Sequence, residues 1–397
     1  MPTKMLAAVL DADWKPRKGY TPTKLEEETR KTAFGSRVWR NPRLELKEIP
    51  VPDIGPSDVL LAVRACGVCG SDIHMYEKDQ DGYMIYPGLT KLPMVIGHEL
   101  SGQVVKTGNA VTGLKEGDMV CAEEMWWCGR CTPCRSGLSN MCENLEEMGF
   151  TKQGGFAEYL AVQDKFCYKI DSLLDRYGDE EKAFEAGSLV EPTSVAYNAM
   201  FVVANGFMPG AYLVVYGGGA IGLASVQLAK AAGAGKVIGF DVKEDRTDLL
   251  KKAGADYVFN PLELQRKGVR PSEKVMEITG GVGADMQVEA AGDPSHTLQE
   301  MQDSVAVDGK ITWIGRADVT APVFLERFQT RRAKIFGAQG HSGHGIFRNV
   351  IRLIAAGNVD MTPLITRRYP LKDISTAMQQ ATKRVDAKIT IKPHAGT

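Results

Sequence analysis

The chain has 397 residues, of which 44% are hydrophobic and 24% are charged. This length favours two domains over one, and the composition is typical of a globular enzyme. Lysine and arginine (48) nearly balance aspartate and glutamate (49), so the chain lacks the positive excess with which proteins bind a nucleic-acid backbone.

No stretch of the sequence approaches the roughly 20 apolar residues that span a membrane. The first apolar segment, Met5–Leu10, is too short for a secretory signal. We therefore expect a cytoplasmic protein that binds neither nucleic acid nor membrane. Eight cysteines in that compartment indicate thiols and metal sites instead of disulfides.

The first part of the chain predicts short strands and loops. Strands are expected at Met5–Leu10, Arg43–Ile49 and Val59–Val63, and a glycine interrupts a further strand over 94–105. Residues 11–40 are expected to form a long loop with one helical turn. The short-stranded, glycine-rich pattern continues to about residue 170 and indicates a mainly β region.

Near residue 183 the pattern changes to alternating helices and strands. Strands are expected at 211–216, 236–240, 256–259, 286–290 and 310–314, and helices at 223–232, 243–253, 272–279 and 295–306. This alternation predicts an α/β fold with a parallel, doubly wound sheet. The end of the chain returns to the β-rich pattern, with strands at 333–338 and 387–392 around a helix at 346–356.

The most specific motif is a set of four closely spaced cysteines, namely Cys128, Cys131, Cys134 and Cys142. Four thiolates at this spacing can close a tetrahedral site, which is what a structural zinc requires. The alternative, four free thiols in one loop, would be a target for oxidation and is disfavoured.

A second motif, Gly217-x-Gly219-x-x-Gly222, follows a strand, opens a helix and is followed by Asp241 at the end of the next strand. This context is typical of dinucleotide binding, because glycines let the backbone approach a pyrophosphate at a helix N-terminus. Asp241 would accept hydrogen bonds from ribose hydroxyls and repel a 2′-phosphate. We expect NAD, although cationic side chains nearby weaken the exclusion of NADP.

A third candidate site begins at Cys66-x-x-Cys69. On its own this pair could bind zinc, form a redox dithiol or consist of buried thiols. Cys69, His98 and an acidic residue would supply three ligands to a zinc ion and leave its fourth position open. A substrate alcohol or ketone could bind there, and the zinc would polarise its oxygen. The acidic candidates are Glu99 and Glu191.

These motifs occur in the order found in the zinc-dependent medium-chain alcohol and polyol dehydrogenases, which the chain resembles over nearly its whole length. The resemblance implies a mainly β, GroES-like catalytic domain formed by 1–195 and 336–397, with an NAD-binding Rossmann domain at 196–335 inserted between them. It also implies two zinc ions per chain, one catalytic and one structural, NAD as cofactor, and a homo-tetramer or homo-dimer.

The resemblance assigns further roles by position. Cys69 and His98 match ligands of the catalytic zinc, whereas Cys66 does not, and the third ligand stays open among Glu99, Glu191 and water. The remaining matches are Ser71 and His74 at proton-relay positions, Asp72 at a position that orients the site, and Lys388 near a position that meets the cofactor's pyrophosphate.

A narrower resemblance, in 86–90, 121–128, 187–198 and 339–345, is to dehydrogenases that act on keto-inositols such as scyllo-inosose. It implies hydride transfer from a secondary hydroxyl of a cyclic polyol or keto-inositol to NAD.

Glu123, His341 and His344 are candidate substrate residues, because the family brings these segments near the cleft and each desolvated hydroxyl needs a polar partner. Alternatively, Glu123 supports the four-cysteine loop and the histidines belong to a surface loop. Three other functions stay open: a sorbitol- or threonine-type dehydrogenase, a reductase without catalytic zinc, and a binding protein that senses NAD.

Overall fold

The structure is a computed structural model that describes residues 2–394 and divides into two compact units. Among the described residues, the first unit contains 2–191, Ile365–Arg384 and 388–394. The second unit contains Pro192–Leu364 and Val385–Ala387. Each unit is described by itself.

The first unit is mainly β, as the sequence predicted. Its largest sheet has seven strands in the order β12-β8-β7-β4-β20-β19, with β11 paired to β4. These strands are β4 (Asp58–Gly67), β7 (Glu99–Thr107), β8 (Met119–Ala122), β11 (Tyr159–Gln163), β12 (Cys167–Lys169), β19 (Ile365–Pro370) and β20 (Lys388–Lys392). A second sheet pairs β1 (Lys4–Trp14) with β3 (Trp39–Pro50) and β6 (Met94–Val95). Hydrophobic side chains of both sheets meet in one core.

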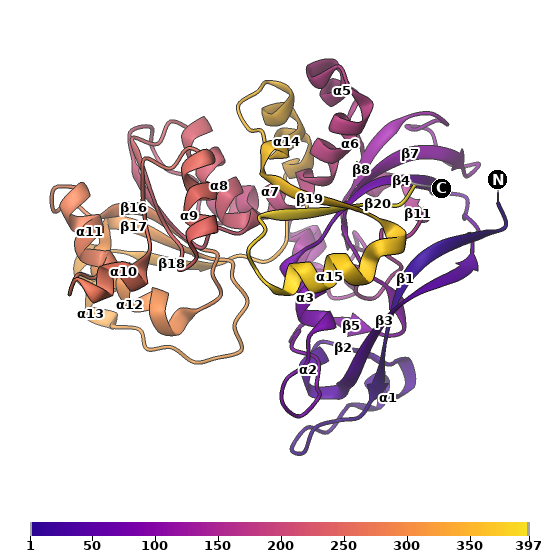
Figure 1. The fold of residues 1–397 in the computed structure, drawn as a ribbon, viewed down its shortest axis with the longest axis horizontal. Helices are drawn as coiled ribbons and strands as arrows, with labels where there is room; N and C mark the ends of the chain where they lie inside the picture. Colours follow the sequence, from indigo (N-terminus) through magenta and orange to yellow (C-terminus); the bar gives the residue numbers. More distant parts are fainter. Residues whose placement is uncertain (1, 395–397) are drawn as a thin grey trace. The chain divides into compact units, whose positions relative to one another are not determined.

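Shorter elements surround these sheets. The helices are α1 (Lys24–Thr29), α2 (Gly35–Val38), α3 (Gly70–Tyr76), α4 (Thr132–Arg135), α5 (Asp171–Tyr177), α6 (Glu180–Ser188) and α15 (Ile374–Thr382). The short strands are β2 (Lys31–Thr32), β5 (Thr90–Lys91), β9 (Met125–Trp126) and β10 (Glu146–Glu147). Helix α15 packs against α3 and β20, so the end of the chain supports the segment that carries Cys69 (Figure 1).

The second unit is a doubly wound α/β fold, which confirms the predicted parallel sheet. Its six strands follow the order β15-β14-β13-β16-β17-β18, and all are parallel. They are β13 (Tyr212–Tyr216), β14 (Lys236–Phe240), β15 (Tyr257–Phe259), β16 (Ala284–Glu289), β17 (Val305–Trp313) and β18 (Lys334–Gly337). The order reverses at β13 and β16, and ligands bind at such switch points in open α/β sheets.

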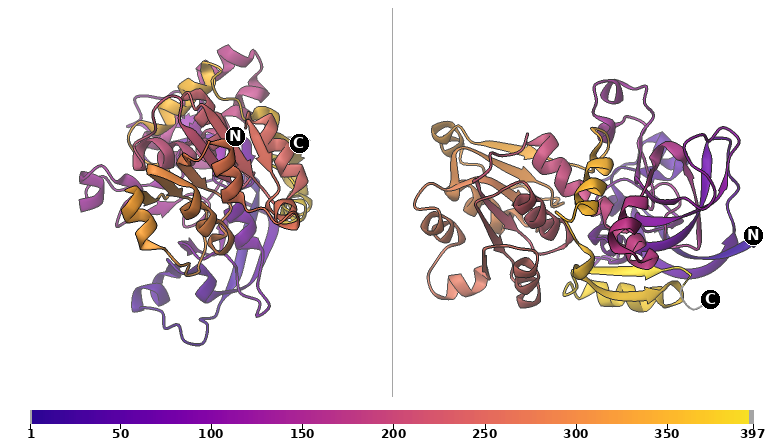
Figure 2. Two further views of the ribbon diagram at one scale, coloured as in Figure 1. Left: turned by 90° about the vertical axis from the view of Figure 1, so that its left-hand side faces the viewer. Right: turned by 90° about the horizontal axis from the view of Figure 1, so that it is seen from above.

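Helices cover both faces of this sheet (Figure 2). The helices of this unit are α8 (Ala220–Ala231), α9 (Glu244–Lys252), α10 (Pro261–Arg266), α11 (Pro271–Ile278), α12 (Pro294–Ser304), α13 (Leu325–Arg331) and α14 (Ile346–Ala355). Helix α7 (Val190–Tyr197) leads into this unit and continues as a π-helix, Asn198–Val203.

The units divide at residues 191/192 and 364/365, whereas the sequence analysis placed the inserted domain at 196–335. The difference at the second boundary, 364 against 335, has a physical reason. Strand β18 pairs with β17 from Lys334 to Gly337, so a boundary after residue 335 would cut through a paired strand. Residues 336–364, including α14, therefore belong to the second compact unit.

Several elements were missed by the sequence analysis. Residues 11–40 are only partly a loop, because β1 continues to Trp14 and β3 begins at Trp39. Helix α3 was not expected, since it starts with glycine and serine, which are poor helix formers. The carboxylate of Asp72 stabilises its N-terminus by accepting a hydrogen bond from the backbone N–H of Cys69 (2.9 Å).

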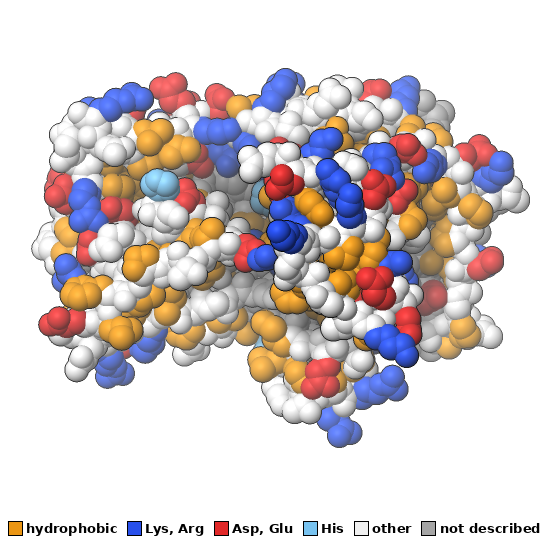
Figure 3. Space-filling view, turned by 90° about the horizontal axis from the view of Figure 1, so that it is seen from below, with side chains coloured by type: hydrophobic (Ala, Val, Ile, Leu, Met, Phe, Trp, Pro, Cys, Tyr) orange, Lys and Arg blue, Asp and Glu red, His pale blue; other side chains and the backbone are white. Residues whose placement is uncertain are grey.

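Within residues 2–394, no helix has the length and apolar character needed to cross a membrane. On the face drawn in Figure 3, cationic and anionic side chains are interspersed, which agrees with the formal charge of −1.

We predict that Phe240→Ala destabilises the second unit far more than Phe324→Ala. Phe240 is 2% exposed and its ring stacks on Tyr216 with a centroid distance of 5.1 Å, whereas Phe324 is 52% exposed. The buried truncation should cost about 3–5 kcal/mol of unfolding free energy and the exposed one less than about 1 kcal/mol, measured by denaturant unfolding. Equal losses would contradict the packing described for β14.

Candidate active site and metal centres

Three potential zinc ligands meet in the first unit. Cys69 is the N-cap residue of α3, and His98 and Glu99 lie at the bend where β7 begins. One ligand atom of each lies within 4.8 Å of the others. A thiol, an imidazole and a carboxylate are all ligands that Zn²⁺ accepts, and three protein ligands leave a fourth position for substrate.

Asp72 holds this cluster together. Its buried carboxylate accepts hydrogen bonds from the backbone N–H of Cys69 (2.9 Å) and of Gly97 (3.2 Å). One of its oxygens also lies 3.7 Å from Nδ1 of His98. Gly97 permits the bend because its φ is +91°, which few other residues adopt. A single carboxylate thus fixes both chain segments that supply candidate ligands.

The surroundings of His98 favour a cation. Burial alone would lower the pKa of His98, but the nearby Asp72 carboxylate and Cys69 sulfur outweigh it and raise this pKa well above its usual value. Nδ1 of His98 has no hydrogen-bond partner among the described residues. The negative environment and the donor set therefore fit a bound metal ion.

Cys66 lies in a different environment from Cys69. It is fully buried in the hydrophobic core, and burial raises the pKa of its thiol well above the usual value. Its sulfur is not part of the cluster around His98. The two cysteines of the C-x-x-C motif thus lie in different environments.

Glu99 forms a buried ion pair with Lys388. The Lys388 ammonium donates hydrogen bonds to the Glu99 carboxylate and to the backbone carbonyl of Val68 (3.1 Å). Strand β20 carries Lys388 there by pairing with the end of β4. The structure therefore places Lys388 beside a candidate zinc ligand, and its contact with the cofactor stays a prediction.

Glu191 is not one of the three clustered ligands. It is buried, and its charge contributes to the raised pKa of His98 and of Lys388, which places it in the electrostatic surroundings of the cluster. The geometry favours Glu99 over Glu191 as the acidic member of the cluster.

Ser71 and His74 lie three residues apart on α3, so their side chains share one face of the helix. The buried Ser71 hydroxyl has no hydrogen-bond partner among the described residues. Burial, helped by the charge of Arg384, lowers the pKa of His74 to about 4, so the imidazole is neutral near pH 7. A free hydroxyl and a neutral imidazole suit proton transfer.

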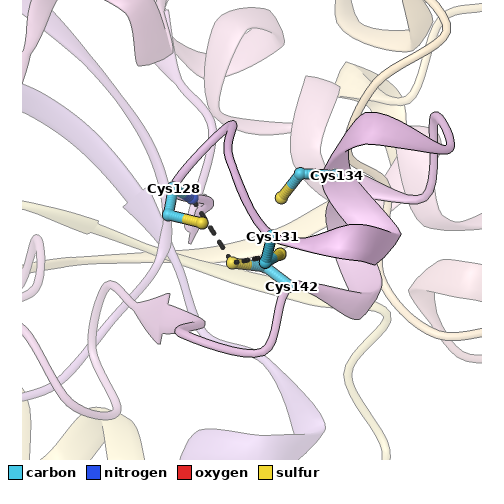
Figure 4. A group of neighbouring side chains, drawn as sticks. All are labelled: Cys128, Cys131, Cys134 and Cys142. Atoms are coloured by element: carbon cyan, nitrogen blue, oxygen red, sulfur yellow. Dashed lines mark hydrogen bonds between the residues drawn. The ribbon is translucent and has the colours of Figure 1, made fainter.

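The four cysteines of the second candidate metal centre also come together (Figure 4). All four sulfur atoms lie within 4.8 Å of one another, and those of Cys131 and Cys142 are 3.8 Å apart, too far for a disulfide. The chain folds back through Gly129 and Gly137, both with positive φ.

Backbone N–H groups point at the sulfurs of Cys128 and Cys142. The sulfur of Cys142 accepts hydrogen bonds from the N–H of Cys128 and of Asn144, both at 3.3 Å. The N–H groups of Arg130 and Cys131 lower the pKa of Cys128 to about 6. Four sulfurs this close together fit a closed, structural zinc site.

The glycine turn of the second unit has the form that a dinucleotide needs. Gly217 has a φ of +103°, and a Cβ there would lie 2.9 Å from atoms of Ala290. A Cβ on Gly222 would overlap the carbonyl of Gly217. A Cβ on Gly219 would meet no protein atom within 4 Å, so this side of the turn is open to a ligand.

Asp241 fixes the turn from the neighbouring strand. Its two carboxylate oxygens accept hydrogen bonds from the N–H of Gly218 (2.7 Å) and of Lys243 (2.8 Å). The Arg246 guanidinium lies 3.9 Å away. Each oxygen of Asp241 keeps a lone pair for a ribose hydroxyl. The negative charge of Asp241 and the positive charge of Arg246 therefore lie side by side at this turn.

The predicted substrate residues fall in both units. Glu123 is buried in the first unit, where its carboxylate accepts a hydrogen bond from the Tyr168 hydroxyl (3.1 Å). His341 is buried in the second unit, and His344 has a φ of +52° in the same loop. Their roles stay predictions.

Glu289 was not among the predicted site residues, although it is a fully buried carboxylate at the end of β16 beside the glycine turn. The signal was a glutamate at the end of a predicted strand, directly before Ala290-Ala291-Gly292.

Comparisons with known proteins identify the family of the chain. Residues 55–172 match the family described as alcohol dehydrogenase GroES-like domain, and residues 220–356 match the family described as zinc-binding dehydrogenase. Scyllo-inosose 3-dehydrogenase of Thermotoga maritima is 42% identical over 93% of this chain and 95% of its own length. L-threonine 3-dehydrogenase of Symbiobacterium thermophilum is 34% identical over 89% of this chain and 95% of its own.

A solved structure of a provisionally assigned alcohol dehydrogenase from Thermotoga maritima superposes with a TM-score of 0.92, at 41% identity, over 98% of this chain and all of that one. The chain belongs to the zinc-binding, GroES-like alcohol dehydrogenase family. It is accordingly an oxidoreductase that uses zinc and a nicotinamide cofactor, and the predicted fold class is confirmed.

We predict that His74 makes the fold less stable in mild acid. The unfolded chain protonates this histidine below its ordinary pKa, whereas the folded chain does so only near 4, so unfolding becomes favoured as the pH falls. From pH 7 to 5, wild type should lose about 2 kcal/mol of unfolding free energy relative to His74→Gln. Parallel losses in both proteins, measured by urea unfolding, would contradict the buried, neutral imidazole.

Proposed function

We propose that this dehydrogenase oxidises a secondary hydroxyl of a cyclic polyol or keto-inositol, with scyllo-inosose as the first candidate, and passes the hydride to NAD. The observation that carries the proposal is the 42% identity, over 93% of the chain, to a protein named scyllo-inosose 3-dehydrogenase. The threonine dehydrogenase is less similar, at 34%, and a threonine- or sorbitol-type substrate is therefore the second candidate.

In this proposal, Cys69, His98 and Glu99 hold the catalytic zinc, and Asp72 orients them through the backbone of α3 and the bend before β7. Zinc bound there would supply the Lewis acid that makes an alcohol easier to deprotonate. Ser71 accepts the proton from the substrate hydroxyl because its own hydroxyl is otherwise unengaged. The proton then passes toward the neutral ring of His74, which relays it onward instead of retaining it, because its pKa of about 4 lies well below neutral pH.

The glycine turn and Asp241 would hold the dinucleotide, whose nicotinamide supplies the hydride chemistry. Support for NAD over NADP comes from the carboxylate of Asp241, which repels a 2′-phosphate. Arg246, 3.9 Å from that carboxylate, reduces the repulsion without replacing it. The four cysteines from Cys128 to Cys142 would hold the structural zinc.

A cytoplasmic location and a homo-dimer or homo-tetramer also stay predictions. The mass of the purified protein by light scattering distinguishes the two assemblies.

The two zinc sites can be told apart by metal analysis. We predict two zinc ions per wild-type chain and about one in each of Cys69→Ser and Cys131→Ser, because each variant removes one ligand of a different site. Cys69→Ser should also abolish turnover while NAD still binds, since the glycine turn is untouched.

Cys66→Ala is the matched control, because this thiol lies in the same stretch but outside the cluster, and it should keep both ions. A Cys69→Ser protein that retained two zinc ions and near wild-type turnover would show that the catalytic zinc is elsewhere. One zinc in the wild-type chain would favour a reductase without catalytic zinc.

The substrate proposal is tested by following NADH formation with scyllo-inosose, other inososes and cyclic polyols, sorbitol and L-threonine, with NAD and NADP side by side. We expect the highest kcat/KM for scyllo-inosose with NAD. A higher value for threonine or sorbitol would replace the first candidate by the second. Tight NAD binding without turnover of any of these alcohols would indicate a sensor.

A further inference from the structure

Glu289 is an ionisable side chain with no part in the function proposed above. It is the last residue of β16, is 0% exposed, and lies at the carboxyl edge of the sheet in the second unit. A buried carboxylate is costly unless hydrogen bonds compensate it. The donors that compensate Glu289 show what it does.

All but one of these donors are backbone N–H groups of the turn that follows the strand. One carboxylate oxygen, Oε1, accepts hydrogen bonds from the N–H of Ala291 (3.2 Å), Gly292 (2.9 Å) and Asp293 (3.4 Å). The second oxygen is 3.2 Å from the same Gly292 nitrogen. The hydroxyl of Thr297 on α12 lies 3.4 Å from Oε1 and 2.9 Å from the backbone carbonyl of Asp293, so it contacts both the carboxylate and the turn. The turn is therefore wrapped around the carboxylate.

The same turn borders the dinucleotide site. The N–H of Ala290 donates to the carbonyl of Tyr216, the residue before Gly217 (2.9 Å). A Cβ on Gly217 would lie 2.9 Å from the carbonyl carbon and oxygen of Ala290. A Cβ on Gly315, at the end of β17, would overlap the Glu289 carboxylate. The Glu289 carboxylate thus lies close to the segments that follow the adjacent strands β13, β16 and β17.

These hydrogen bonds also fix the direction in which the peptide groups of the turn point. In a trans peptide the C=O points opposite to the N–H. Because the N–H groups of residues 291–293 point inward at Glu289, the carbonyls of residues 290–292 point away from it, and that of Ala290 lies on the Gly217 side. The turn therefore presents hydrogen-bond acceptors at its outer side, which suit hydroxyl donors and not phosphates.

We propose that Glu289 is a positioning residue for the cofactor: its buried carboxylate gathers the N–H groups of residues 291–293, so that the turn beside Gly217 offers its carbonyls to ribose hydroxyls of the bound dinucleotide. This inference rests on the dinucleotide site of the proposed function. It adds a residue that never touches the ligand yet sets the orientation of the groups that do.

Isothermal titration of the purified full-length chain with NAD tests the proposal. In Glu289→Gln an amide N–H replaces one carboxylate oxygen and meets the N–H of Gly292, so the turn loses its charged acceptor. The Kd for NAD should rise about tenfold, as expected when a hydrogen bond to a charged group is lost. The KM for the alcohol, measured at saturating NAD, should stay within about twofold of wild type.

Glu185→Gln is the matched control, because it also neutralises a buried glutamate, but in the first unit, where Arg368 pairs with both carboxylate oxygens (2.7 and 2.8 Å). It should lower the melting temperature and leave the Kd for NAD unchanged. If Glu289→Gln does not fold, Thr297→Val removes a hydroxyl that contacts both Asp293 of the turn and Glu289, and it should raise the Kd about threefold, in line with the loss of one hydrogen bond.

The outcomes separate this inference from the function on which it rests. A wild-type chain that binds NAD, with variants at 289 and 297 that bind it equally well, would overturn the role of Glu289 and leave the dinucleotide site intact. A wild-type chain that binds neither NAD nor NADP would overturn the dinucleotide site and the role of Glu289 together.

Discussion

The hydrogen bonds of the Asp72 carboxylate are the constraint on which the candidate catalytic site depends. They join the N–H of Cys69, at the start of α3, to the N–H of Gly97, at the bend before β7. Since the carboxylate is fully buried, losing either donor would leave a charge uncompensated, and the two segments are held in register. A thiol and an imidazole that are distant in sequence are thereby kept together.

The second unit uses the same principle twice at its sheet edge. Asp241 accepts the N–H of Gly218 and Glu289 accepts those of residues 291–293, so each carboxylate shapes a turn that a glycine makes possible. The acidic groups thus act through the backbone, and the ligand meets peptide groups whose direction they have set. In both units, carboxylates bonded to backbone N–H groups organise the segments that carry the proposed chemistry.

Much of this arrangement follows from local sequence patterns. The parallel sheet was predictable because buried strands alternate with helices, and the four-cysteine centre because its ligands are close in sequence. Helix α3 was missed because Gly70 and Ser71 favour a loop until Asp72 caps the turn. The ion pair of Glu99 with Lys388 depends on the pairing of β20 with β4, which no local pattern reveals. The choice between Glu99 and Glu191 likewise needed the folded chain.

The central claim, that Cys69 and His98 hold a catalytic zinc while the four cysteines hold a second one, is tested most directly by anomalous diffraction at the zinc edge from crystals of the purified protein. The account predicts two peaks per chain, one among Cys69, His98 and Glu99 and one among the sulfurs of Cys128, Cys131, Cys134 and Cys142. A chain with full dehydrogenase activity and a single peak, at the four cysteines, would contradict it.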